Sequence, residues 1–160
     1  MATSKSFGVM SLILLFSALF FPIIKIGNMG LSPVYFILHL GELSGSSGSS
    51  MTSGGVPGIS DIAVGVALMF IALIAGVMAV DLHFRKDNRK TYIVVLLFAL
   101  LSIVEFSLGY SSLAHAMVKS LSPNSLGDLT GLAYVLIGPG DAILLEAFAA
   151  ALAGAAFIRE

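Results

Sequence analysis

The chain has 160 residues and a formal net charge of −1; 58% of its residues are hydrophobic and 11% are charged. Soluble domains usually carry about a quarter charged residues, so this composition and a mean hydropathy of +1.03 exclude a water-soluble fold. The sequence contains no cysteine, which excludes disulfides, thiol chemistry and Cys-based metal sites, and its near-neutral charge gives no footprint for nucleic-acid binding.

Four stretches are apolar enough to be membrane-spanning helices, because a bilayer core about 30 Å thick needs roughly 20 apolar residues. They cover approximately residues 7–26, 62–80, 91–112 and 133–158. The last is ambiguous, because Gly138–Pro139–Gly140 either precedes a helix that begins near Asp141 or kinks a longer one. We predict a single all-α integral membrane domain over residues 1–160, with four transmembrane helices in an antiparallel up-down bundle.

The connections between these helices differ in length. The first external segment, 28–60, contains an apolar part (33–43) that predicts contact with the membrane surface or the bundle, and a Ser/Gly-rich part (45–55) that predicts a flexible linker. The second external segment is 114–132. Four helices with a long first external loop are similar in layout to tetraspan families such as the claudins, but the Trp and Cys residues typical of claudins are absent from this sequence.

Basic residues are distributed unequally between the two ends of the predicted helices. With the N-terminus inside, the cytoplasmic ones are Lys5, Arg85, Lys86, Arg89, Lys90 and Arg159, and the external ones are Lys25 and Lys119. The positive-inside rule then places both termini in the cytoplasm, and we expect the cytoplasmic membrane of a prokaryote. We expect the basic turn (Arg85, Lys86, Arg89 and Lys90) to set this topology and to contact anionic lipid headgroups.

Two glutamates fall within the predicted spans, and intramembrane ionisable groups are the features that most often indicate function. Glu105 and Glu146 lie at a similar predicted depth, roughly 10 Å and 8 Å from the outer ends of their helices. Each lies on a stripe of small residues, which predicts close helix packing. The pair is a candidate proton or cation site, with Lys25 and Asp141 near the outer ends of the helices and Lys25 as an available counter-charge. The alternative is that each glutamate is a neutral or paired group that fixes helix packing.

The remaining polar residues indicate little chemistry. Asp81 and Arg85 have the i,i+4 spacing of a local ion pair at the inner end of a helix. His39 and His115 are weak candidates for a shared metal on the external side, because their spacing matches no ligand motif. We therefore predict no metal site and no cofactor. The sequence contains none of the common hydrolase, metalloprotease or phosphate-loop motifs, so we predict no catalytic residue and consider an enzyme the less favoured interpretation.

Two functional hypotheses remain. The first is a non-catalytic integral membrane subunit that packs into and stabilises a larger membrane protein complex, favoured by the small-residue faces and the small extramembrane mass. The second is a small homo-oligomeric proton- or cation-coupled transporter that uses the intramembrane glutamates. The expected partners are the lipid bilayer and other membrane subunits or further copies of the chain.

Overall fold

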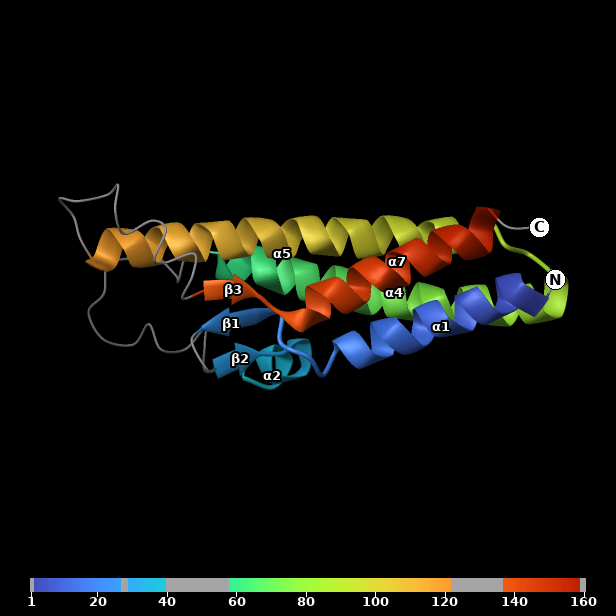
Figure 1. Cartoon of the computed structure of the whole chain (residues 1–160), viewed down its shortest axis with the longest axis horizontal. Helices are drawn as coiled ribbons and strands as arrows, with labels where there is room; N and C mark the ends of the chain where they lie inside the picture. The colour runs from blue at the N-terminus through green and yellow to red at the C-terminus, as the bar shows by residue number, and fades with distance from the viewer. Residues whose placement is uncertain (1, 27–28, 40–57, 122–136, 159–160) are drawn as a thin grey trace.

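The computed structural model describes residues 2–26, 29–39, 58–121 and 137–158. Four long helices lie side by side: α1 (Ala2–Ala18), α4 (Ile59–Lys86), α5 (Tyr92–Leu121) and α7 (Asp141–Ile158) (Figure 1). Three of them, α4, α5 and α7, are long and apolar enough to cross a membrane, as a multi-pass membrane protein requires. The start of α1 and the end of α7 lie beside the α4–α5 turn, and we call this end of the molecule the turn end (Figure 1).

Helix boundaries differ from the predicted ones at several positions. The first helix ends at Ala18 rather than near Ile26, because Pro22 cannot continue a helix and the chain turns there into a strand. The last helix begins at Asp141, which confirms the first of the two alternatives for it, and the longer helix from about residue 133 was wrong. Helices α4 and α5 run further than predicted, to Lys86 and Leu121, because apolar content marks the membrane-embedded part of a helix and not its full length.

A small sheet at the opposite end, the sheet end, was not predicted and corrects the all-α assignment. Strands β1 (Ile24–Ile26), β2 (Met29–Leu31) and β3 (Ile137–Pro139) form an antiparallel sheet in the order β2-β1-β3.

This sheet fixes the start of α7 against the segment that follows α1. The Gly140 N–H donates to the Ile23 carbonyl (2.7 Å) and the Ala142 N–H donates to the Pro22 carbonyl (3.0 Å). The second bond satisfies one of the N–H groups that a helix leaves free at its start. A Cβ at Gly140 would collide with the Pro22 carbonyl oxygen, so only glycine allows this close approach.

The apolar part of the first external segment forms a short helix, α2 (Pro33–Leu38). Ser32 caps it by accepting a hydrogen bond from the Tyr35 N–H, and proline occupies its first turn, where the missing N–H costs nothing. Phe36 is buried in the core, so α2 covers the sheet end of the bundle. The predicted linker, residues 45–55, lies outside the described residues.

The core of the bundle consists of two apolar clusters. The cluster nearer the sheet end includes Ala18, Ile23, Ile24, Phe36, Ile62, Val66, Met69, Phe106 and Ala142. The cluster nearer the turn end includes Leu15, Ala72, Ala79, Tyr92, Val95, Ala99, Ala149, Ala153 and Ala156. On α5, Ser102 lies between Ala99 of one cluster and Phe106 of the other; on α7, Glu146 lies between Ala149 and Ala142. Two buried polar side chains therefore lie where the two apolar clusters meet.

Candidate functional site

Glu146 lies on the buried face of α7, which is otherwise made of alanines. That face comprises Ala142, Glu146, Ala149, Ala150, Ala153 and Ala156. The Glu146 side chain has an exposed fraction of 0%, and it is the only fully buried carboxyl group in the described part of the chain. Small residues on both sides bring the neighbouring helices close and so exclude solvent from it.

The Glu146 carboxyl group has no hydrogen-bond partner. Within the described residues, no donor or acceptor reaches either of its oxygens with hydrogen-bond geometry. The polar neighbour that faces it is the Ser102 hydroxyl on α5. That hydroxyl uses its own hydrogen elsewhere, because Ser102 Oγ donates to the Gly65 carbonyl of α4 at 2.9 Å. An unpartnered buried polar group is rare in folded proteins and requires an explanation.

The second predicted glutamate does not join this site. Glu105 is only half-buried on α5, and the buried position beside it is taken by Phe106. Of the two glutamates only Glu146 is therefore fully buried, and the structure does not place both carboxyl groups in one buried site.

The predicted counter-charge has a different partner. Lys25 Nζ, on β1, lies 2.7 Å from Asp141 Oδ2, in the first turn of α7. Both side chains are nearly half exposed at the sheet end, so the pair links the sheet to α7 at the surface and Lys25 is not a partner of Glu146. Such exposed pairs contribute little to stability.

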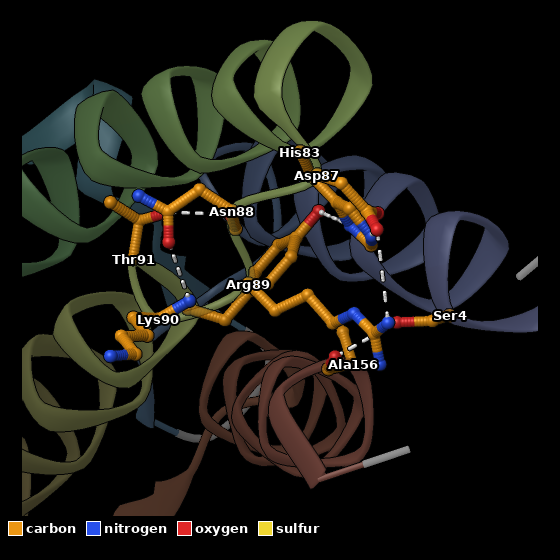
Figure 2. Close-up of polar contacts among 9 residues, drawn as sticks. Ser4, His83, Asp87, Asn88, Arg89, Lys90, Thr91 and Ala156 are labelled. Carbon is orange, nitrogen blue, oxygen red and sulfur yellow. Dashed lines mark hydrogen bonds and ion pairs between the residues drawn. The ribbon is translucent and has the colours of Figure 1, made fainter. Parts of the chain in front are cut away.

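The turn end carries a polar network around the buried His83 side chain that the sequence analysis missed (Figure 2). His83 is buried, with Nε2 3.4 Å from Asp87 Oδ1 and Nδ1 3.3 Å from the Tyr92 hydroxyl. Arg89 Nη2 lies 3.9 Å from the other oxygen of Asp87, which ends α4 in a left-handed conformation (φ 49°). The network joins the end of α4 to the start of α5, which explains the tight hairpin between them.

Two serines of α1 bind the backbone of α7, and they too were missed. Ser4 Oγ donates to the Ala156 carbonyl (2.9 Å, Figure 2), and Ser11 Oγ donates to the Ala149 carbonyl (2.7 Å). The donors are seven residues apart on one helix and the acceptors are seven apart on the antiparallel helix. Serines seven residues apart on one helix and alanines seven apart on the other were the sequence signal that could have identified this interface.

The other predicted polar residues lie at the surface. Arg85 Nε lies 2.7 Å from Asp81 Oδ1, and both side chains are largely exposed. His39 Nδ1 lies 3.0 Å from the Tyr35 carbonyl and His115 Nδ1 lies 3.1 Å from the Ser111 carbonyl, each within its own helical segment. The described residues contain no group of three or more His, Asp or Glu side chains placed to hold a metal.

Comparisons of this chain with protein-family models, with curated proteins and with solved structures found no match. The interpretation of the site therefore depends on its own geometry. Its distinctive element is the fully buried carboxyl group of Glu146, which lies between two apolar clusters.

Proposed function

We propose that the chain is a multi-pass membrane protein in which α1 is a fourth membrane-spanning helix and the turn end faces the cytoplasm. Large apolar side chains are exposed around the bundle, on α1 (Met10, Ile13, Phe16), α4 (Ile71, Ile74, Val77), α5 (Leu97, Leu101, Leu108) and α7 (Leu144, Phe148). So much exposed apolar surface suits lipid and not water. The 17 residues of α1 span about 25 Å, near the lower limit for a membrane helix.

Both termini should then be cytoplasmic, because the basic residues are concentrated at the turn end. Protease-sensitive tags at residue 1 and at residue 160 should both resist external protease in intact cells and be cleaved after lysis. A tag inserted in the Ser/Gly-rich segment 45–55 is the matched control and should be cleaved without lysis. Cleavage of either terminal tag in intact cells would contradict this topology.

We propose further that Glu146 is a proton-binding site in the middle of the bundle and that the protein is a small proton-coupled transporter. The observation that carries this proposal is the complete burial of a carboxyl group that has no hydrogen-bond partner in the described residues. A lone carboxylate in an apolar interior is far more costly than its neutral acid form. The neutral acid carries an O–H, and Ser102 Oγ, whose own hydrogen goes to Gly65, is the acceptor that this O–H would take if the two side chains moved within hydrogen-bond distance.

A proton fits the site better than a metal ion does. Hard cations such as Ca²⁺ take six to eight oxygen ligands, and Mg²⁺ takes six. Among the described residues, neither Glu146 oxygen has a hydrogen-bond partner, and the hydrogen of the Ser102 hydroxyl is already donated to Gly65. A proton needs only one carboxyl oxygen to bind, and Glu146 provides it.

Infrared spectroscopy of the reconstituted protein tests this proposal. We expect a protonated-carboxyl band at neutral pH that is absent from Glu146→Gln and retained in Glu105→Gln, the matched control, because only Glu146 is fully buried. Transfer to D₂O should shift this band, because a working proton site must exchange its proton with water. The shift should be complete before the core amide protons exchange. A band that exchanges only as slowly as the core amides would show a locked structural acid and would contradict the proposal.

The subunit hypothesis remains the alternative proposal, but its main support has changed. The alanine face of α7 is buried against the other helices of this same chain, as are Ala72, Gly76 and Ala79 of α4. These small residues are therefore accounted for by packing within the chain and do not require a partner. Native mass measurement after mild detergent extraction separates the two proposals, because foreign subunits favour the alternative and copies of this chain favour the transporter.

A further inference from the structure

An open groove lies between α1 and α4 at the turn end, away from the Glu146 site. It is lined by Lys5, Ser6, Val9, Met10 and Phe84 and has a volume of about 430 Å³. That volume falls within the range of roughly 300–1,000 Å³ typical of small-molecule sites. Met10 and Phe84 are 52% and 55% exposed, so the groove opens toward the surroundings of the bundle. We call it the α1–α4 groove.

One end of this groove carries a positive charge. Lys5 Nζ lies 5.1 Å from the centroid of the Phe84 ring, within the range of a cation–π contact. In the described part of the chain Lys5 has no carboxylate partner, because Asp81 pairs with Arg85 and Asp87 pairs with His83 and Arg89. The Lys5 ammonium group is therefore positioned by an aromatic ring and remains available to an anion.

The turn end as a whole has an excess of positive charge. Its described basic side chains are Lys5, Arg85, Lys86, Arg89 and Lys90, and its described acidic side chains are Asp81 and Asp87. From Lys5 toward the middle of α1, the groove is lined by Val9 and Met10. Ile13 is exposed one turn further along the helix. The groove thus has a cationic head and an apolar body.

We propose that the α1–α4 groove binds one anionic phospholipid, with its phosphate on Lys5 and an acyl chain along Val9 and Met10. The groove lies where the apolar part of α4 meets Arg85 and Lys86, which is the level of the lipid headgroups if α4 spans the bilayer. A small soluble anion would contact Lys5 but would leave the apolar lining unused. An anionic phospholipid matches both parts.

Tryptophan fluorescence can test this, because the chain has no tryptophan of its own. Phe84→Trp places a single reporter in the groove and preserves the cation–π partner of Lys5, since tryptophan is the better ring for that contact. The protein is reconstituted in phosphatidylcholine vesicles and titrated with lipids that carry brominated acyl chains. We expect brominated phosphatidylglycerol to quench with about fivefold higher apparent affinity than brominated phosphatidylcholine, the effect of one basic group near an anionic lipid.

Two controls make the result specific to the groove. Lys5→Gln in the Phe84→Trp background should abolish the preference, whereas Lys90→Gln, an exposed lysine of the same end outside the groove, should retain it. Phe148→Trp places the reporter at an exposed position in the middle of α7 instead and should show no preference for either lipid.

Equal quenching by the two lipids, or equal loss in the Lys5 and Lys90 variants, would overturn the proposal. If Phe84→Trp does not reconstitute, the same lysine variants are compared without the reporter, by mass spectrometry of the lipids retained after purification. In that comparison the wild type and Lys90→Gln should retain phosphatidylglycerol, and Lys5→Gln should not. Retention by Lys5→Gln would again overturn the proposal.

Discussion

Replacing Gly109 by alanine should lower the free energy of unfolding by about 1–3 kcal/mol, the usual cost of forcing an extra methyl group into a packed interior. Gly109 of α5 lies against the start of α4. An added Cβ would be 2.9 Å from the Gly58 carbonyl oxygen, 3.2 Å from the Ile62 nitrogen and 2.7 Å from Ile62 Cγ1. Because two of these atoms belong to the backbone, no side chain can rotate away and the two helices must separate.

Gly154→Ala is the matched control for this prediction. Gly154 also lies inside a helix, α7, but the nearest atom to its added Cβ would be Leu96 Cδ2 at 3.9 Å, an ordinary contact. Alanine there should leave stability unchanged or raise it by up to about 1 kcal/mol through its higher helix propensity. Denaturant titration of the purified protein, followed by far-UV circular dichroism, measures both variants. Equal effects would mean that α4 and α5 are not in close contact at Gly109.

The helices could be predicted from the sequence because each depends on a long local run of apolar residues. The sheet could not, because its strands have three residues each and show no alternating pattern. The start of α7 depends on hydrogen bonds from Gly140 and Ala142 to residues 22 and 23, more than a hundred positions away in the sequence. Local composition contains no information about such contacts. The sequence around Pro139 was therefore compatible both with a helix that begins near Asp141 and with a longer, kinked helix.

The burial of Glu146 could be predicted for the same local reason, because alanines precede and follow it at helical spacing. The position of Glu105 could not. Counted from Ser102, Glu105 lies about 60° to one side of the helix face and Phe106 about 40° to the other, so both are compatible with one packing stripe. Gly65 on α4 determines that Phe106 is the buried residue, because the absence of a side chain at Gly65 leaves room for the Phe106 ring. A Cβ at position 65 would lie only 2.6 Å from that ring.

Replacing Glu146 by methionine should stabilise the protein while abolishing its proposed proton site. A buried polar group without a hydrogen-bond partner costs about 1–3 kcal/mol, and an unbranched apolar side chain of similar length removes that cost without leaving a cavity. We therefore expect the free energy of unfolding to rise by about that amount. We expect a proton site in an apolar core to lower stability, because its carboxyl group is retained for function and not for folding.

Leu145→Met is the control, because it exchanges one apolar side chain for another at the neighbouring position of α7 and should shift stability by less than about 1.5 kcal/mol. The sign of the Glu146→Met effect separates the two interpretations of the glutamate. If the carboxyl group were there to fix helix packing, its loss would destabilise the bundle, as removing one partner of a buried hydrogen bond does. A stable, well-folded Glu146→Met protein that has lost the exchangeable carboxyl band would instead show that the fold does not require this carboxyl group. The group would then be required for proton binding alone.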